Sequence, residues 1–441
     1  MIMTAYMRTT AMEDRNMNMQ QILTIVKLIL TLTVMTFLLV TLRSIRTSIL
    51  ELKCNPRDEN CSFDWLKYSP ISNNNNDDDV TSQWMTSSAL EQQELNRRRR
   101  NKLLIFSLPR SGSSFLGELF NRNDDVFYLY EPLHANEVLN NLPMMTSSIR
   151  KTRHKIARKL NDFYGCNLMQ HEHLFRLLSY PELSNPHFRL MSKVLASPPF
   201  CNDVTSANVT EAEYRKSCRP IDTRLLTNVC MYKKSVVIKE LMHRLPIYDV
   251  IEMAKLFHIE NMQSLWLVRD PRAILASMMS MGWVTETKTQ SLEDVVKVTV
   301  GRVCDMYQRF LITLTKIPAK LRKNFHILRY EDFVSQPRDV ISQISKLSGE
   351  LLNGKKSVDW VHRNTHGKST GLNNVDSYSV LSRNATFSLT SWRFSLELRH
   401  IRLVQQKCST AMERLGYLSL WDEKLLTNLD SPTFKELKRI L

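Results

Sequence analysis

The chain has 441 residues, of which 43% are hydrophobic and 24% charged, and these proportions are ordinary for a globular protein with a packed core. Its formal charge of +16 favours polyanionic partners, such as nucleic acid, anionic lipid or acidic glycans, without choosing among them. No repeat of fixed period is visible, which argues against solenoids and propellers.

The N-terminal part of the chain carries an apolar segment long enough to cross a membrane. Residues 22–42 are almost entirely apolar or threonine, interrupted by Lys27 near one end, and about 20 such residues span a bilayer. No small-x-small cleavage site follows, so an uncleaved signal anchor is favoured over a cleaved signal peptide. Basic residues on both flanks leave the orientation open. We expect a cytoplasmic tail at 1–21, the transmembrane anchor at 22–42 and a polar, flexible lumenal stem at 43–101.

The residues downstream of the anchor have features of a lumenal protein. Three N-x-Ser/Thr sequons, at Asn60, Asn208 and Asn384, follow the anchor, and so do all eight cysteines. Their even number suits disulfide formation in an oxidising compartment, although the pairing is open. No C-x2-C pair is present, which disfavours a metal site built on cysteine. The sequence therefore predicts a disulfide-bonded glycoprotein.

Residues 102–441 form the expected catalytic domain, which begins with a strand, a turn and a helix. An apolar run at 103–106 precedes a turn at 109–112, and apolar residues then follow at helical spacing. Comparable apolar runs recur at 126–130, 236–238, 265–268 and 325–328. Strands that alternate with helices predict an α/β fold with a central parallel sheet flanked by helices. Ligands in such folds bind where the strands end, so functional residues are expected just after each run.

The turn after the first run has the composition of a phosphate cradle. Ser107-Leu-Pro-Arg-Ser-Gly-Ser-Ser-Phe115 leads into a helix, and its Gly112 lets successive backbone N–H groups point at an anion. Arg110 adds a permanent positive charge, and the serines add hydroxyl donors. The second glycine and the lysine of a Walker loop are missing, which disfavours an ATPase or a kinase. A plain turn with a helix N-cap is the alternative that this segment alone leaves open.

A second candidate anion site follows the run at 265–268. It has the sequence Arg269-Asp-Pro-Arg-Ala-Ile-Leu-Ala-Ser277, in which Pro271 suits the first turn of a helix. Arg269 then stands at the strand end and Ser277 two turns into the helix, where both can reach one phosphate. A surface pair between Arg269 and Asp270 is the alternative. Two such units in one sheet are what a nucleotide with phosphates at both ends requires.

In combination, these two motifs resemble those of Golgi carbohydrate sulfotransferases, most closely the galactose/N-acetylglucosamine/N-acetylgalactosamine 6-O-sulfotransferase group. The resemblance runs through Pro109 to Phe115, Phe127 to His134, Arg269 to Ala273, Arg329 to Asp332, Asn364 to His366 and Trp392-Arg393. It implies a P-loop-like sulfotransferase fold, with 3'-phosphoadenosine 5'-phosphosulfate as the co-substrate that donates the sulfuryl group.

The resemblance also implies two groups of donor-binding residues. Arg110 would contact the sulfuryl group and the leaving phosphate, whereas Arg269 and Ser277 would bind the 3'-phosphate. The first group is Pro109, Arg110, Ser111, Gly112, Ser113, Ser114 and Phe115. The second group is Arg269, Asp270, Pro271, Arg272, Ala273, Ile274, Leu275, Ala276 and Ser277. The chain departs from the family pattern around Lys239 to Arg244, which leaves a substrate-binding role for those two residues in doubt.

Transfer to an alcohol also needs a base that takes the hydroxyl proton. Glu131 follows the run at 126–130, which we expect beside the first cradle in the sheet, and the resemblance supports it as the catalytic base. His134 is the alternative, because histidine titrates near neutrality. Glu131 could instead be a structural partner of an arginine. Glu331 and Asp332 are expected to orient a loop or cap a helix, and no constellation of metal ligands is evident.

These features predict a single-pass type II enzyme of the Golgi membrane with a lumenal catalytic domain. By resemblance it would sulfate position 6 of Gal, GlcNAc or GalNAc in a glycan or glycosaminoglycan. The alternatives are a membrane-tethered nucleotide-binding protein and a module that holds acidic glycans, both without transferase activity. Nucleic acid is disfavoured as a partner, because the anchor, sequons and cysteines place the domain outside the cytosol. Loops that face the acceptor are expected within 136–229, where the resemblance is weakest.

Overall fold

The computed structural model describes residues 100–134, 153–202, 209–245, 251, 262–365 and 385–436. The chain divides into two units, Met1–Asp79 and Val80–Leu441, and every described residue belongs to the second. The expected anchor and the asparagines of the three sequons lie outside the described residues. Within the described ranges, no helix combines the length and the apolar character needed to cross a membrane.

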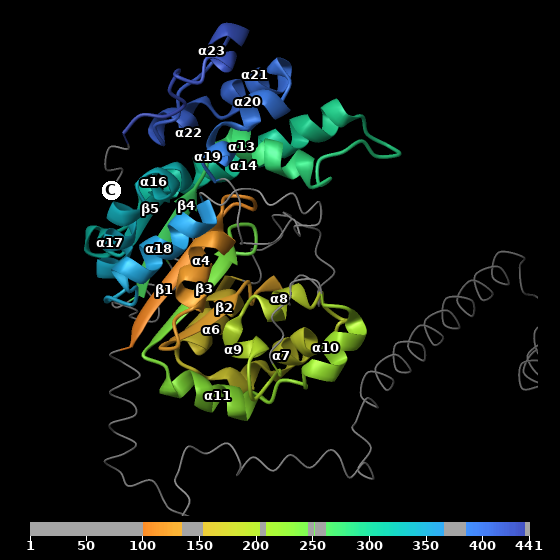
Figure 1. Cartoon of the computed structure of the whole chain (residues 1–441), viewed down its shortest axis with the longest axis vertical. Helices are drawn as coiled ribbons and strands as arrows, with labels where there is room; N and C mark the ends of the chain where they lie inside the picture. The colour runs from red at the N-terminus through yellow and green to blue at the C-terminus, as the bar shows by residue number, and fades with distance from the viewer. Residues whose placement is uncertain are drawn as a thin grey trace, which may run out of the picture. The chain divides into compact units, whose positions relative to one another are not determined.

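A five-stranded sheet forms the centre of the described unit, and its paired strands all run parallel (Figure 1). The strands are β1 (Asn101–Ser107), β2 (Val126–Tyr130), β3 (Ser235–Leu241), β4 (Met262–Val268) and β5 (Phe325–Arg329). Each strand contains one of the five apolar runs, so the predicted α/β fold with a central parallel sheet is confirmed. The strand order is β2-β3-β1-β4-β5, which places β1 in the middle.

Helices connect the strands. Those that precede β3 are α4 (Ser113–Asn121), α6 (Arg153–Tyr164), the 3-10 helix η4 (Leu168–His171), α7 (Glu172–Ser179), α8 (His187–Leu190), α9 (Lys193–Ala196), α10 (Glu211–Ser217) and α11 (Thr223–Tyr232). Those that follow β4 are α13 (Pro271–Ser280), α14 (Leu292–Leu314) and α15 (Ala319–Arg322). Those that follow β5 are α16 (Tyr330–Ser335), α17 (Pro337–Leu347), α18 (Gly354–Thr365), α19 (Ala385–Thr390), α20 (Trp392–Ser395), α21 (Leu398–Lys407), α22 (Ser409–Arg414) and α23 (Glu423–Thr427).

The central strand β1 is buried on both of its faces. Successive side chains of a strand point to opposite sides of the sheet. Leu104 and Phe106 pack in the core that includes α6, α11 and α14, whereas Leu103 and Ile105 pack with α4, α17 and α18. Helices lie on both faces of the sheet (Figure 1). An uninterrupted apolar run is what a strand covered on both faces requires. Because helices occupy both faces, a ligand enters at the edge where the strands end.

The observed strand order corrects one expectation. We expected β2 beside β1, which would have placed Glu131 next to the first cradle, but β3 lies between these two strands. The order across a sheet depends on which strands pair in three dimensions, and a single sequence carries no direct mark of that pairing. The register sets Tyr130 opposite Lys239 of β3. Glu131 therefore meets the end of β3 rather than the turn after β1.

Three disulfides cross-link the described unit, which confirms the predicted disulfide-bonded domain and gives the pairing that the sequence left open. They are Cys166–Cys230, Cys201–Cys218 and Cys304–Cys408. The remaining two cysteines, Cys54 and Cys61, lie outside the described residues.

Candidate active site

The turn between β1 and α4 is shaped to receive an anion. Arg110 and Gly112 have φ angles of 65° and 88°, in the left-handed region, and α4 begins at Ser113. A Cβ at Gly112 would lie 2.5 Å from Cδ2 of Tyr330, so glycine is required where the turn passes that ring. No described side chain caps α4, and its first turn holds no acidic residue. The N–H groups and the positive end of the helix dipole are therefore available to an anionic ligand.

The loop after β4 supplies a second cationic side chain. Asp270 caps α13 by accepting a hydrogen bond from the backbone N–H of Arg272, and Pro271 takes the first turn of the helix. This start to the helix leaves Arg269 at the strand end, as the sequence predicted. Its Nη1 donates to the carbonyl oxygen of Arg110 at 2.8 Å. One guanidinium therefore joins the two strand-end loops directly.

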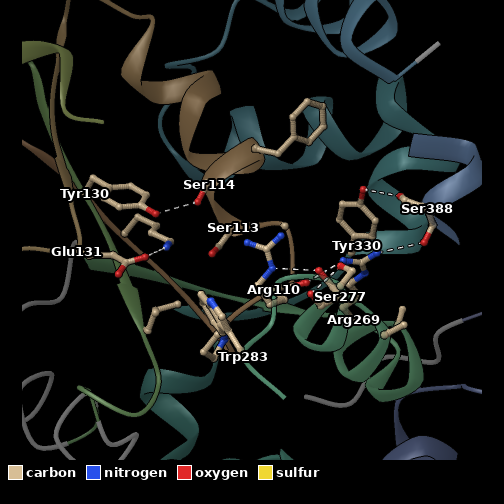
Figure 2. Close-up of a pocket in the computed structure, with 18 of the residues that line it drawn as sticks. Arg110, Ser113, Ser114, Tyr130, Glu131, Arg269, Ser277, Trp283, Tyr330 and Ser388 are labelled. Carbon is tan, nitrogen blue, oxygen red and sulfur yellow. Dashed lines mark hydrogen bonds and ion pairs between the residues drawn. The ribbon is translucent and has the colours of Figure 1, made fainter. Parts of the chain in front are cut away.

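Residues from three segments meet around these loops (Figure 2). Nε of Arg110 donates to Oγ of Ser277 at 3.0 Å, and Nη2 of Arg269 donates to the carbonyl oxygen of Ser388 at 3.1 Å. The guanidinium carbon of Arg269 lies 4.7 Å from the centroid of the Tyr330 ring. The resemblance placed Arg110 and Ser277 at opposite ends of one ligand, yet their side chains are in contact. The reason is that β1 and β4 are adjacent strands whose loops leave the sheet side by side.

The cavity that these side chains line fits an anionic ligand of nucleotide size. Its volume is about 480 Å³, within the usual range for sites that bind small molecules. Nε of Arg269 is buried and finds no hydrogen-bond acceptor within the described ranges. A buried donor left in this way costs free energy, which an oxygen of a bound phosphate would offset. Arg110 and Arg269 both line this one cavity, as a ligand with two phosphates requires.

A buried ionic cluster forms another wall of the cavity. Glu131 has a φ angle of 46°, and its carboxylate binds the ammonium of Lys239 and the guanidinium of Arg244. These three side chains are between 2% and 5% exposed. Burial by itself raises the pKa of Glu131, but the two cations outweigh burial and lower the pKa to about 2. Glu131 is therefore an ionised carboxylate with a weakened affinity for protons.

The predicted site residues divide into those that line the cavity and those that lie outside it. The cavity is lined by Pro109, Arg110, Gly112, Ser113, Ser114, Phe115, Glu131, Arg269, Ala273, Ala276 and Ser277. The lining does not include Ser111, His134, Asp270, Pro271, Arg272, Ile274 and Leu275. Among these, Arg272 is fully buried in a pair with Asp270, at 2.7 Å, and also donates to Gln405 at 2.8 Å. Its guanidinium therefore holds the loop after β4 in place from within the protein, outside the cavity.

Several residues of the lining were not predicted from the sequence. The centroid of the Trp283 ring lies 5.7 Å from the guanidinium carbon of Arg110. His187 and Phe188 contribute further aromatic surface. Tyr330 directly follows β5, so a search at every strand end would have found it. For His187 and Phe188 the sequence offers no comparable signal, because α8 is a short helix that lies many residues along the chain from the end of any strand.

A buried carboxyl group, Glu331, ties the second loop to the C-terminal part of the chain. One of its oxygens accepts from the backbone N–H of Asp270 at 3.0 Å, and the other accepts from the hydroxyl of Tyr417 at 3.0 Å. Burial, and to a lesser extent the charge of Asp270, raises the pKa of Glu331 to about 7. Asp332 pairs instead with Arg329, at 2.7 Å. Both acids hold loops and helices in place, outside the lining of the cavity.

Comparison with known proteins identifies relatives of this chain. The model of the sulfotransferase family matches residues 102–350. Carbohydrate sulfotransferase 1 of Danio rerio is 30% identical over 354 residues, which cover 74% of this chain and 80% of that protein. Carbohydrate sulfotransferase 6 of Homo sapiens is 30% identical over 348 residues, which cover 74% and 83%. A sulfotransferase structure from Mycobacterium avium aligns with 74% of this chain and 80% of its own at 14% identity, but its TM-score of 0.36 is too low to support a conclusion.

Proposed function

Because the chain belongs to the sulfotransferase family, we propose that it transfers a sulfuryl group from 3'-phosphoadenosine 5'-phosphosulfate to a hydroxyl of a carbohydrate. The names of its curated relatives support carbohydrate as the acceptor class. The observation that carries the proposal is the convergence of Arg110, Arg269 and Ser277 in one cavity, from the ends of two adjacent strands. That arrangement suits a donor with phosphates at both ends.

The residues of the two loops would share the donor between them. Arg110, Ser113, Ser114 and the N–H groups at the start of α4 would hold the sulfuryl group and the 5'-phosphate, where negative charge grows as the bond to sulfur breaks. Arg269, with its buried Nε, would hold the 3'-phosphate together with Ser277. The hydrogen bond between Arg110 and Ser277 is then exchanged for bonds to the donor.

Glu131 is the proposed base, because it is the one carboxylate among the described residues that line the cavity. In the reaction, the acceptor oxygen forms a bond to sulfur and the bond from sulfur to the donor phosphate breaks. The hydroxyl proton passes to Glu131 as the new bond forms, because the oxygen then becomes more acidic than a carboxyl group whose pKa is about 2. Lys239 and Arg244 keep this carboxylate ionised, so it is ready to accept a hydrogen bond from the hydroxyl. The ring of His134 stacks on Phe188 and lies outside the lining, so it takes second place.

The finer parts of the proposal concern acceptor and location. We propose position 6 of Gal, GlcNAc or GalNAc as the acceptor hydroxyl, in a glycan or glycosaminoglycan. We also propose a type II Golgi membrane protein anchored by residues 22–42, with the catalytic domain in the lumen. The three disulfides agree with an oxidising compartment.

The proposal is tested by measuring donor binding and transfer with the same preparation. Calorimetry with adenosine 3',5'-bisphosphate reports the donor site. Mass spectrometry of products from a mixed keratan, chondroitin and N-acetylglucosamine acceptor library reports transfer and the position modified. Binding together with a product heavier by one sulfate supports the proposal. Binding without any transfer would favour a nucleotide-binding protein, and the absence of both would favour a module that only holds acidic glycans.

A further inference from the structure

The cavity wall next to Glu131 contains two aromatic side chains to which the proposed chemistry gives no role. His187 and Phe188 of α8 line the cavity in the company of Tyr130 and Glu131. Phe188 packs against both hydrophobic cores of the described unit but remains partly exposed where it lines the cavity. Apolar surface that faces a cavity favours a ligand that can cover it.

The neighbours of Phe188 fix the orientation of its ring. The ring stacks on His134 with the centroids 3.5 Å apart and the planes 12° from parallel. The guanidinium carbon of Arg244 lies 5.9 Å from the Phe188 centroid, and Arg244 is itself held by Glu131. The Tyr130 ring lies 6.2 Å away. His134 therefore covers one face of the ring, and the part that remains uncovered has a fixed orientation next to the proposed base.

We propose that Phe188 is the platform on which the pyranose ring of the acceptor stacks, and that it determines which sugar is accepted. A pyranose has an apolar face of C–H groups and a rim of hydroxyls. Its C–H face against Phe188 would cover the exposed ring, while the rim faces the Glu131 carboxylate. This inference rests on the proposed function and adds a specificity-determining residue to it.

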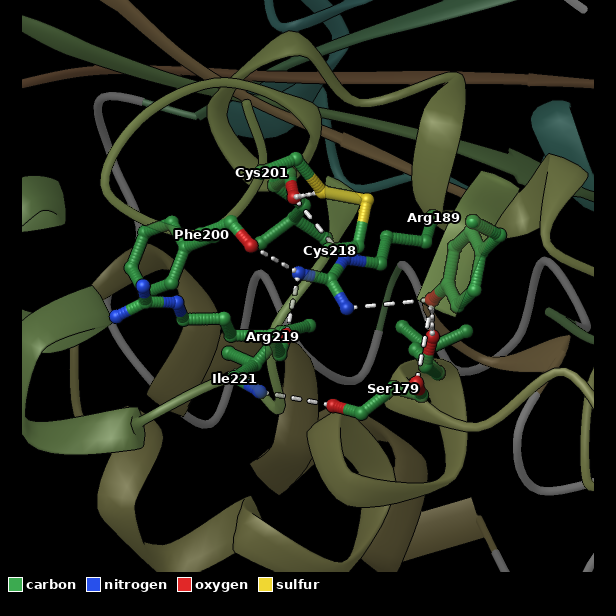
Figure 3. The surroundings of a disulfide bond; sticks show 10 residues. Ser179, Arg189, Phe200, Cys201, Cys218, Arg219 and Ile221 are labelled. Atoms are coloured by element: carbon green, nitrogen blue, oxygen red, sulfur yellow. Dashed lines mark hydrogen bonds between the residues drawn. A yellow bond between two sulfur atoms is a disulfide. The ribbon is translucent and has the colours of Figure 1, made fainter. Parts of the chain in front are cut away.

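The next residue, Arg189, holds the platform from the side away from the cavity. Its side chain is 0% exposed and is absent from the lining. Its nitrogens donate to neutral oxygens (Figure 3): the carbonyls of Leu195 at 3.0 Å, Phe200 at 2.9 Å and Arg219 at 2.8 Å, and the hydroxyl of Tyr214 at 3.2 Å. Hydrogen bonds from a charged donor are stronger than those from a neutral donor, so these hydrogen bonds of Arg189 fix α8 firmly.

The disulfide Cys201–Cys218 lies next to Arg189 (Figure 3), and we call this bridge together with the hydrogen bonds of Arg189 the frame of Phe188. Phe200 precedes one cysteine and Arg219 follows the other, so the bridge holds together the two carbonyls that Nη2 of Arg189 reaches. The backbone N–H of Arg219 also donates to the Phe200 carbonyl at 2.9 Å. Arg189 and this disulfide therefore act as positioning elements, whose effect on the acceptor passes through Phe188.

Substitution of Phe188 tests the platform itself. Phe188→Ala is expected to raise the acceptor KM about tenfold, the size of effect that the loss of one aromatic contact gives. Its kcat should change little, because a stacked ring contributes equally before and during transfer. Phe188→Leu keeps the apolar bulk without the flat ring and should show the same direction of change, whereas Phe188→Tyr should restore the parent KM. The Kd for adenosine 3',5'-bisphosphate should stay unchanged throughout, because the arginines that hold it are untouched.

A pair of double variants tests the frame. Replacing Cys201 and Cys218 by serine should raise the acceptor KM roughly 3- to 10-fold with the donor Kd unchanged, because Phe188 loses its fixed position. The control replaces Cys166 and Cys230, whose sequence separation is 64 residues against 17 for the first pair. The larger loop should cost more stability. Cys166 lies beside Arg100, at the start of β1 and so at the opposite end of the strands from the cavity, and its loss should leave the acceptor KM unchanged.

Two results would overturn the inference. One is an acceptor KM that stays at the parent value in both Phe188→Ala and Phe188→Leu. The other is a rise of the acceptor KM in the Cys166 and Cys230 control that equals the rise in the Cys201 and Cys218 variant, because the effect would then follow stability alone. Failure of the proposed function looks different, because the parent enzyme itself would then transfer no sulfate to any acceptor of the library.

Discussion

Replacement of Gly112 by alanine is a direct test of the anion-binding turn. Gly112 has a φ angle of 88°, and an L-residue there costs about 1 kcal/mol or more. The new Cβ would also lie 2.5 Å from Cδ2 of Tyr330. That ring is held on two sides, since its hydroxyl is 3.0 Å from Oγ of Ser388 and its face meets Arg269. Crowding of this kind costs about 1 to 3 kcal/mol.

We therefore expect Gly112→Ala to lower the free energy of unfolding by about 2 to 4 kcal/mol. Movement of Tyr330 would also displace Arg269, so the Kd for adenosine 3',5'-bisphosphate should rise about tenfold or more, the equivalent of one charged hydrogen bond. Urea unfolding measures the first effect and calorimetry the second.

The matched control is Gly282→Ala. Gly282 has a φ angle of 69°, but a Cβ there would meet nothing within 4 Å. It therefore carries the backbone cost without the clash, and it should lose only about 1 kcal/mol and keep the donor Kd. Equal losses of stability in the two alanine variants, together with unchanged donor binding in Gly112→Ala, would refute the packing argument for this turn.

Two further predictions concern the buried acids. Glu131→Gln should lower kcat by about 10²- to 10⁴-fold. The Kd for the donor should stay equal or fall, because Lys239 and Arg244 lose the anion that neutralises them. A loss of donor affinity as large as the loss in kcat would assign Glu131 to donor binding instead. The pKa of Glu331 is raised from 4.5 to about 7, so between these two pH values the native state holds a proton that the unfolded chain releases. The stability from this proton is complete below the pKa of the unfolded chain. It is lost as the pH rises through the pKa of the folded state. The glutamine in Glu331→Gln cannot titrate, so its free energy of unfolding should rise by roughly 2 to 3 kcal/mol relative to that of the parent between about pH 5 and about pH 8. Urea unfolding measures this difference. A difference that does not change with pH would contradict the raised pKa.

The sequence predicted the strands well because burial on both faces leaves a strong mark. Each of the five apolar runs became a strand of one parallel sheet, and the residues just after β1 and β4 meet at one cavity, as the strand-end rule requires. The order of the strands was only partly foreseen. Interchanging β2 and β3 alters no local pattern, so nothing in the residues themselves indicated that β3 would pair with β1.

The ionic cluster around Glu131 was predicted only in part, since a pair with an arginine was an open alternative but neither Arg244 nor the added Lys239 could be identified. Lys239 and Arg244 were left in doubt because they depart from the family pattern, and their pairing with Glu131 exists only once β2 and β3 are adjacent. The range 136–229, in which we expect acceptor-facing loops, includes Phe188, the residue that we propose as the acceptor platform. Its exact place depends on a disulfide whose pairing could not be deduced from the order of the cysteines.

The stretch from α8 to Arg219 is continuous in sequence and closes upon itself through Arg189 and the disulfide Cys201–Cys218. The arginines of the donor loops, by contrast, are carried by the sheet. This stretch also contacts the rest of the domain, because the backbone N–H of Tyr130 donates to Oγ of Ser192 at 2.9 Å and the Phe188 ring stacks on His134. With these contacts kept, the stretch can be exchanged while the arginines that hold the nucleotide stay in place. Grafting the equivalent stretch of a relative onto this scaffold is therefore a direct route to enzymes that keep one sulfate donor and choose a different sugar.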